Sequence, residues 1–296
     1  MTEDRHFIDH IYFSEHLKSH YPKIYGELTG IQSKHKVCHN VLHGTADYWC
    51  RDYMPIQVSG NYFVQFKYHP DYLEGLRKYE ISTGASIKLA IEKIQSPLIK
   101  SSPIVADGGN FTLAGIQKEG IHTPVVIMTE KIFTENPDMT RECIIKQLES
   151  LFPNHRFLFL PWDKDDTCGH TDGIIHAVGN NKILVNLKVY PNDIAAKMRS
   201  ILNSCFEVID LELSNYHDMS WAYINMIHTK DVIIIPGLGL PTDQKAQEHI
   251  QKLFPEYKDR IYQVQMPTIV KKMGRCIKLP LLDIYSIDKI PKYLGT

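Results

Sequence analysis

A histidine and several carboxylates lie close together near the middle of the chain. The segment 165–173, with the sequence DDTCGHTDG, follows one apolar run at 157–160 and precedes another at 174–178. If Asp172 is already in extended structure, His170 and Asp172 point to the same face, because side chains alternate along a strand. An imidazole and a carboxylate on one face can hold a cation and move protons. A solvated acidic loop explains the same residues equally well.

Three further short clusters each fall at the end of a predicted strand. They are WCRD at Trp49 to Asp52, DGGN at Asp107 to Asn110, and MGRC at Met273 to Cys276. Taken singly, these are more often a surface ion pair, a β-turn and a small buried side chain. Together with His170 they supply carboxylates for a cation, a proton carrier and a thiol that can attack.

The composition limits the function classes. The 296 residues are 43% hydrophobic and 23% charged, with a formal net charge of -1. A chain of this length can bury a sizeable core, and it lacks the basic excess of a nucleic-acid surface. Its 15 histidines are scattered, without an HExxH or paired CxxC pattern. We therefore expect neither a metal nor another cofactor.

Cysteine usage and hydropathy predict the compartment. The six cysteines show no tight pairing pattern, which favours free thiols in a reducing environment. Residues 1–10 carry several charges and no apolar run, and no stretch approaches the ~18 apolar residues of a spanning helix. The sequence predicts a soluble, cytoplasmic protein that binds neither membrane nor nucleic acid. It leaves open whether the protein is a homo-oligomer.

Alternating strand and helix patterns must position the four clusters. Gly60-Asn61 predicts a hairpin turn between strands at 55–58 and 62–66. Further strands are expected at 36–40, 49–51, 103–106, 111–114, 124–128, 156–160, 173–178, 183–187, 206–211, 222–227, 232–235, 261–264, 276–279 and 282–285. Helices are expected near 13–25, 85–94, 140–152, 193–205 and 242–253. No linker divides the chain, so one α/β domain over 1–296 is predicted.

In this order, the clusters resemble those of the guanidino-group-modifying enzymes, the pentein superfamily of deiminases and amidinotransferases. The Trp-x-Arg-Asp stretch at 49–52 resembles the first motif of agmatine deiminases. Gly169-His170-x-Asp172, preceded by Asp166-Thr167, resembles their central motif. The stretches 223–225 and 240–243 resemble those that precede the nucleophile in the agmatine deiminase branch. The resemblance runs from about Trp49 to Leu282.

The resemblance implies a fold and a reaction. The fold would be an α/β propeller of five ββαβ-like units around a central active site. The reaction would convert a guanidinium to a ureido group with release of ammonia. Asp52 and Asp172 would grip the planar cation, because carboxylates match its N–H pairs. Cys276 would attack as a thiolate, and His170 would protonate the leaving ammonia and then activate water.

Two more residues are expected near the substrate, and other thiols compete with the nucleophile. Asp107 would meet the far end of the substrate or make the turn. Trp49 would cover the guanidinium or belong to the core. Cys168 and Cys50 adjoin site residues and are expected to be bystanders. Because nearby carboxylates raise a thiol pKa, we expect Cys276 to become acidic only when a guanidinium is bound.

Two departures from the agmatine deiminase pattern leave the substrate open. Asp107 stands where these enzymes usually have Glu, and KKMGRC at 271–276 replaces their Gly-rich run ending Asn-Ile-His-Cys. The latter is closer to the Arg-Cys-x-x-x-Pro style of arginine deiminases. Agmatine is the first expectation, with arginine and peptidyl-arginine as alternatives. The other readings are an amidinotransferase, a non-catalytic binding member of the fold, and a Cys-His hydrolase acting on an ordinary amide.

Overall fold

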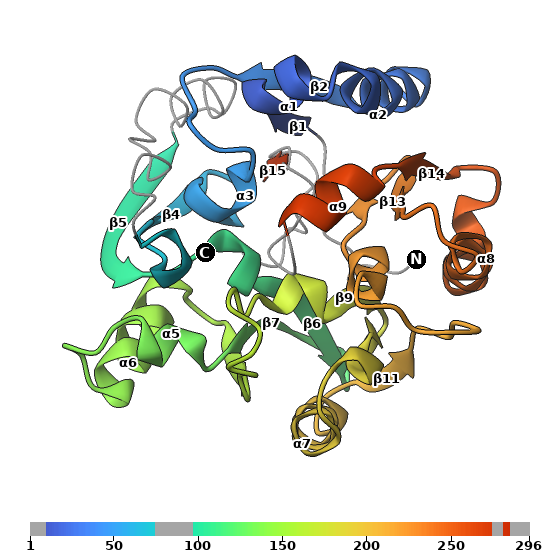
Figure 1. Cartoon of the computed structure of the whole chain (residues 1–296). Coiled ribbons are helices and arrows are strands. Elements are labelled where there is room, and N and C mark those ends of the chain that lie inside the picture. Colours follow the sequence, from blue (N-terminus) through green and yellow to red (C-terminus); the bar gives the residue numbers. More distant parts are fainter. Residues whose placement is uncertain (1–9, 75–96, 274–280, 285–296) are drawn as a thin grey trace.

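Five three-stranded sheets form a ring in the computed structural model, which describes residues 10–74, 97–273 and 281–284 (Figure 1). Four of the sheets are built from consecutive strands. Their strands are β3 (Ile56–Ser59), β4 (Tyr62–Lys67), β5 (Leu98–Val105), β6 (Thr112–Lys118), β7 (Ile121–Thr129), β8 (Arg156–Leu160), β9 (Ile175–Gly179), β10 (Lys182–Val185), β11 (Glu207–Asp210), β12 (Ile227–His228), β13 (Ile233–Gly237) and β14 (Ile261–Gln265). The predicted turn at Gly60-Asn61 joins the antiparallel pair β3 and β4.

Every sheet has the same pairing. A middle strand runs antiparallel to one neighbour and parallel to the other, as β7 does between β6 and β8. In the fifth sheet the middle strand is β1 (His10–Ser14), parallel to β2 (Cys38–Leu42) and antiparallel to β15 (Leu281–Ile284). One strand near the end of the described chain therefore completes a sheet begun by its first strands. The predicted five-unit α/β propeller is confirmed.

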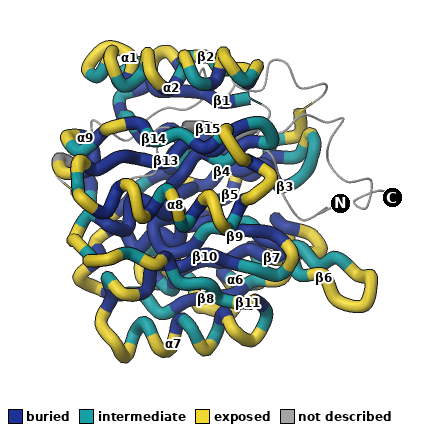
Figure 2. The backbone as a smooth tube through the Cα atoms, turned by 90° about the vertical axis from the view of Figure 1, so that its right-hand side faces the viewer, coloured by how far each residue is buried: buried dark blue, intermediate teal, exposed yellow. Residues whose placement is uncertain are grey.

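The parallel pairs need crossover connections, and within the described residues helices provide them for four of the five sheets, on the outside of the ring. Such helices are α1 (Glu15–His20), α2 (Pro22–Lys34), α5 (Lys131–Thr134), α6 (Arg141–Leu151), α7 (Asn192–Asn203) and α8 (Asp243–Leu253). Short 3-10 turns are η1 (Asp71–Leu73), η5 (Leu187–Val189) and η7 (Pro255–Tyr257). The predicted cap of α6 is present, because the Thr140 side chain accepts a hydrogen bond from the Cys143 N–H. Figure 2 shows exposed outer faces on α1, α2 and α7.

A second set of short helices precedes the first strand of each sheet and lies toward the middle of the ring. These are α3 (Cys50–Tyr53), η3 (Gly108–Asn110), η4 (Thr171–Gly173) and η6 (Ser220–Ile224), while α9 (Pro267–Met273) precedes β15. Neighbours in this inner set contact one another, α3 against η3, η3 against η4, and η4 against η6. The inner helices carry three of the four clusters picked out in the sequence.

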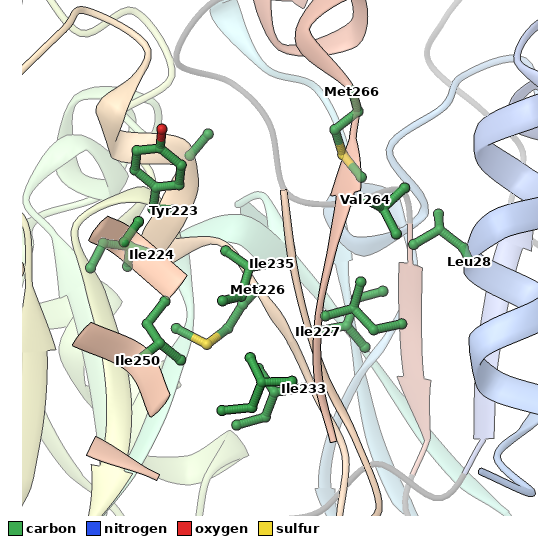
Figure 3. Packing of buried hydrophobic residues seen from close by; sticks show 14 of the residues in the cluster. Leu28, Tyr223, Ile224, Met226, Ile227, Ile233, Ile235, Ile250, Val264 and Met266 are labelled. Atoms are coloured by element: carbon green, nitrogen blue, oxygen red, sulfur yellow. The ribbon is translucent and has the colours of Figure 1, made fainter. Parts of the chain in front are cut away.

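Apolar strands fill the space between the inner and outer helices. Ile233, Ile234 and Ile235 of β13 are all fully buried, as expected for a strand covered on both faces. Figure 3 shows Ile233 and Ile235 packed between the β14 side chain Val264 on one side and Ile250 of α8 on the other. This core holds the inner helices at fixed positions.

Several predicted elements differ from the structure. The predicted helix at 13–25 is wrong at its start, because Phe13 belongs to β1, and the helical region continues to Lys34. The strands predicted at 49–51 and 222–227 are largely the inner helices α3 and η6. Short apolar runs are ambiguous between a strand and a buried helical turn. The helix predicted at 85–94 and the strand predicted at 276–279 lie outside the described residues.

Among the described residues, no helix is long and apolar enough to cross a membrane.

Candidate active site

Asp52, Asp107, His170 and Asp172 come together where the inner helices meet. They come from three different units of the ring, and the exposed fraction of each side chain is at most 4%. Asp172 lies in the 3-10 turn η4 and is not extended as the two-residue spacing assumed. The two side chains nevertheless reach the same place, because His170 is the extended residue just before that turn.

Arg51 holds the turn that follows Asp107. Its Nε donates to the Gly108 carbonyl at 3.1 Å, and its Nη2 donates to the Phe111 carbonyl at 2.8 Å. The neighbouring Asp52 accepts a hydrogen bond from the Gly109 N–H at 2.9 Å. The simpler interpretation of Arg51-Asp52 as a surface ion pair is therefore wrong. The two residues tie α3 and η3 together from opposite sides of one turn.

Gly109 marks the point on which the site converges. A Cβ at this residue would lie 2.4 Å from His170 Nδ1, 2.7 Å from Asp52 Oδ1 and 2.9 Å from Asp172 Oδ2. These separations are shorter than any ordinary contact of a side-chain carbon. The position requires glycine, and it places one imidazole nitrogen and two carboxylate oxygens around a common volume.

His170 is paired with Asp107. The distance from His170 Nε2 to Asp107 Oδ2 is 3.0 Å, and the Tyr72 hydroxyl of η1 donates to the same oxygen at 3.0 Å. The other ring nitrogen, Nδ1, is buried without a hydrogen-bond partner. Asp107 thus contacts the imidazole, and it also opens the turn of η3, as the simpler expectation had it. Its contact with a substrate stays a prediction.

The carboxylates make the imidazole a cation at neutral pH. Burial alone would lower the pKa of His170, but Asp52, Asp107 and Asp172 outweigh it and raise the pKa to about 10. Burial, with the charges of Asp107 and Asp172, raises the pKa of Asp52, while His170 and the Gly109 N–H oppose this rise. The Cβ position of Gly109 is therefore bordered by a proton donor, His170, and by the carboxylates of Asp52 and Asp172.

Contacts of Gly169 and Asp166 fix the loop that carries His170. Gly169 has φ +58°, and a Cβ there would strike the indole of Trp162 at 2.7 Å. Asp166 accepts from the Gly169 N–H at 3.1 Å and from the Tyr190 hydroxyl at 3.2 Å. Both oxygens of Asp166 are thus used within the protein, which keeps the following imidazole in place.

The stretches 223–225 and 240–243 form a separate support. The Tyr223 hydroxyl donates to Asp243 Oδ1 at 2.6 Å, and Asp243 Oδ2 accepts from the Gly239 N–H at 3.0 Å. Asn225 is buried at the end of η6. These contacts join the inner helix η6 to the start of α8.

Trp49 is 8% exposed and packs in the largest hydrophobic cluster, next to Tyr48. The core interpretation of Trp49 therefore fits its surroundings, and a contact with a substrate stays a prediction.

The cysteines differ in their state. Cys50 is buried, and burial raises its pKa to about 12. Cys168 is buried and disulfide-bonded, so the expectation that all cysteines are free is wrong for this residue. The other described cysteines, Cys38, Cys50, Cys143 and Cys205, are free. The predicted nucleophile Cys276 lies outside the described residues.

Cys276 stands at the same sequence distance from the strand that follows it as two of the site residues do. Asp107 stands five residues before β6, and His170 stands five residues before β9. Cys276 stands the same five residues before β15. Moreover, β15 contacts α3, the helix that carries Asp52. Cys276 therefore has the sequence position that site residues occupy in two other units.

No group of three or more His, Cys, Asp or Glu side chains suited to a metal ion occurs within residues 10–74, 97–273 and 281–284. The cluster of three aspartates around His170 is instead arranged about a single imidazole.

Known proteins share this architecture. The agmatine deiminase of C. jejuni has a TM-score of 0.71 to this chain at 14% identity, covering 95% of this chain and 94% of its own, which shows the fold. An agmatine deiminase of Pseudomonas syringae pv. syringae (strain B728a) is 24% identical over 206 residues, 56% of this chain and 54% of its own length. A relative from Marinomonas sp. (strain MWYL1), whose name also refers to agmatine deiminase, is 24% identical over 267 residues, 72% of this chain and 67% of its own length.

The ring of five units with its central cluster defines a protein of the pentein fold. The family model of the Porphyromonas-type peptidyl-arginine deiminases matches residues 18–277, and the chain belongs to that family. It spans about two thirds of the length of the Marinomonas relative and about half of that of the Pseudomonas relative.

Three residues around the site were not predicted to act there. Tyr72 and Lys131 belong to segments without any motif, and Arg51 was given no role beyond its place in the first cluster. Only the position of Arg51 beside Asp52 could have suggested its contact with the glycine turn. Tyr72 and Lys131 approach the site through the folding of the chain alone.

Proposed function

We propose that this protein is a deiminase that hydrolyses the guanidino group of a small cationic substrate, with agmatine as the first candidate. The observation that supports this most is the convergence of His170, Asp52 and Asp172 beside Gly109. A planar cation suits two buried carboxylates, which have no such use in binding a neutral amide. The agmatine deiminase relatives make agmatine the natural first choice.

In protein whose Cys168 disulfide has been opened by a thiol reductant, Asp52 and Asp172 bind the N–H groups of the guanidinium and hold its carbon toward the thiolate of Cys276. The sulfur adds to that carbon, and the C–N bond to one terminal nitrogen breaks. The imidazolium of His170 gives its proton to this nitrogen, which leaves as ammonia and leaves an amidino-thioether on the enzyme. The raised pKa of His170 supports its role as the proton donor.

Water completes the cycle. The imidazole, now neutral, takes a proton from a water molecule, and the hydroxide adds to the carbon of the intermediate. The C–S bond then breaks as the proton of the new hydroxyl group passes to solvent, which releases the ureido product and restores the thiolate. The charge of Asp107, 3.0 Å from His170 Nε2, stabilises the imidazolium that forms again. One water is consumed and one ammonia is released in each turnover.

The test is an assay of ammonia and ureido product with agmatine, arginine and arginyl peptides, each with and without an added amine acceptor. We expect turnover of agmatine without the acceptor, and a loss of roughly a thousand-fold or more in kcat for Cys276→Ala. Cys143→Ala, which removes an exposed thiol, is the matched control and should keep full activity. Cys168→Ala should also turn over.

The other outcomes have definite meanings. Activity only with the amine acceptor would indicate an amidinotransferase, which shares the covalent step. Activity on arginine or on peptides alone would keep the chemistry and replace the substrate. Binding of agmatine without ammonia release, unchanged in Cys276→Ala, would show a non-catalytic member of the fold and overturn the proposal.

A further inference from the structure

Lys131, at the start of α5, is a buried ammonium close to the site. Its side chain is 1% exposed, although lysine is rarely buried unless it is paired. Its Nζ donates to Asp71 Oδ1 at 2.8 Å and to the Thr167 carbonyl at 2.6 Å, and it lies 3.3 Å from Glu135 Oε1. Such a buried charge is expensive unless these partners are all in place.

Two of those partners belong to segments that carry site contacts. Thr167 precedes His170 by three residues on the same loop. Asp71 adjoins Tyr72, whose hydroxyl donates to Asp107 Oδ2 and whose ring stands edge-on to the His170 ring at 6.2 Å. The Lys131 ammonium also lies 4.9 Å from the centre of the Tyr72 ring, within the range of a cation–π contact.

We propose that Lys131 and Tyr72 are positioning residues, which together hold Asp107 and His170 in the arrangement that proton transfer requires. Lys131 binds the two segments that meet at the site, η1 through Asp71 and the His170 loop through the Thr167 carbonyl. Tyr72 then fixes the Asp107 carboxylate with its hydroxyl. The inference rests on the proposed function, since it assigns both residues to the proton-transfer step of that reaction.

Tyr72 also adjusts the strength of His170 as an acid. Its hydroxyl and His170 Nε2 share one Asp107 oxygen. Without the hydroxyl, more of the Asp107 charge acts on the imidazolium, which keeps its proton to higher pH and gives it up less readily. The other charges that act on His170, those of Asp52, Asp172 and Glu135, stay in place in such a variant.

The surroundings explain why the anchor is a cation. The Glu135 side chain, one turn after Lys131, is 5% exposed, and its Oε1 lies 3.3 Å from the Lys131 ammonium without a hydrogen-bond partner. The charges of Asp71 and Asp107 act on Lys131 together with that of Glu135. A neutral side chain at 131 would leave Glu135, whose side chain is 5% exposed, without the ammonium that lies 3.3 Å away, whereas Asp71, at 53% exposed, would stay hydrated. The segments that they belong to would then separate.

The experiment compares Tyr72→Phe and Lys131→Met in steady-state kinetics with agmatine across the pH range. For Tyr72→Phe, which keeps the ring and the packing, we expect kcat to fall about ten-fold at nearly constant KM. The basic limb of kcat should move to higher pH. For Lys131→Met we expect a larger fall in kcat, and addition of Glu135→Gln should restore part of the stability but not the rate.

Matched controls come from other parts of the chain. Lys197→Met removes an exposed lysine that also pairs with a carboxylate one turn away, Asp193. Tyr262→Phe removes a hydroxyl that accepts a hydrogen bond from the Lys34 ammonium at 2.9 Å. Both should keep wild-type kinetics. If Tyr72→Phe keeps them too, or if it loses only thermal stability with an unmoved pH profile, the proposal is overturned.

A measurement without substrate separates this proposal from the proposed function. The His170 ring can be titrated by NMR in protein with 13C-labelled histidine, with its resonance assigned by its loss in His170→Gln. The His170 pKa should rise in Tyr72→Phe and stay unchanged in Tyr262→Phe. An unchanged value in both variants contradicts the positioning role, whether or not the wild-type protein turns over any guanidino compound.

Discussion

Gly109 is the position at which one added carbon atom would disturb the site most. Its N–H holds Asp52, and the space where a Cβ would be is bordered by His170 and Asp172. No other described glycine has three polar site atoms within 3 Å of its Cβ position. The requirement for glycine here is thus one of space around the site, whereas at Gly169 it is one of backbone conformation as well.

Gly109→Ala should therefore remove activity while leaving the fold intact. The added methyl group must displace at least one of the three polar atoms, and misplacement of a reacting group by about 1 Å costs roughly a hundred-fold in rate. The measurement is kcat/KM with agmatine, together with thermal unfolding. Gly30→Ala on α2, where a Cβ meets nothing within 4 Å, should be fully active. Wild-type kcat/KM in Gly109→Ala would contradict the proposed site.

At the scale of elements, the site depends on short helices that are held by contacts between units. Arg51 of α3 illustrates this, because it donates to two carbonyls of the turn at η3, which belongs to the next unit. A guanidinium can serve two acceptors in a fixed geometry, and an ammonium cannot match that arrangement. The spacing between α3 and η3 therefore depends on the two hydrogen bonds that the Arg51 guanidinium donates.

Arg51→Lys should lower kcat/KM by roughly ten- to a hundred-fold, because the turn that carries Gly109 loses one of its two anchors. The control is Arg260→Lys, at which a guanidinium also donates to two backbone carbonyls, those of Asp231 and Glu256, far from the site. Both variants should unfold somewhat more easily in urea, but only Arg51→Lys should lose activity. Equal activity in the two variants would remove Arg51 from the site.

The sequence predicts long, periodic elements better than the short inner helices. The patterns for α6, α7 and α8 extend over three turns and match the structure closely, whereas α3 and η6 have only 4 and 5 residues and were taken for strands. The motifs identified Asp52, Asp107, His170 and Asp172 because each is a carboxylate or an imidazole near the end of a predicted strand. They could not show that Asp107 contacts His170, because that pairing joins residues 63 positions apart through the curvature of the ring.

At the scale of the whole molecule, the charged centre links stability to pH. The His170 pKa is raised from 6.5 to about 10 in the folded protein, so the folded state holds this proton more tightly than the unfolded chain does. The stabilisation is complete below about pH 6.5 and is lost as the pH rises toward 10. The raised pKa of Asp52 acts in the same direction at lower pH.

We therefore expect the free energy of unfolding to fall between pH 6.5 and pH 10, and His170→Gln to flatten this fall. Urea unfolding of both proteins across this range is the measurement. His249→Gln, on the outer helix α8, is the control and should retain the wild-type slope. If the free energy of unfolding falls with pH equally in wild type and His170→Gln, the carboxylates do not raise the pKa of His170.

The five units of the ring repeat in structure, but the sequence shows no matching repeat of residues. The five units share a pairing pattern of strands but few residue types, since one unit supplies Asp52, another Asp107 and a third His170. A shared backbone with different side chains at equivalent places gives no self-similarity for a sequence comparison to detect. It does give the site its variety of chemical groups.

The pairing of β1 with β15 has a consequence for how the protein is made. Phe13 is synthesised before its antiparallel partner Leu281, and nearly the whole described chain separates the two residues. Domains whose contacts are local can fold as they leave the ribosome, whereas this ring waits for its last strand. Until then the first sheet has an open edge, and the proposed nucleophile, five residues before β15, has not been released. Chains that lack β15 and the five residues before it should therefore be inactive.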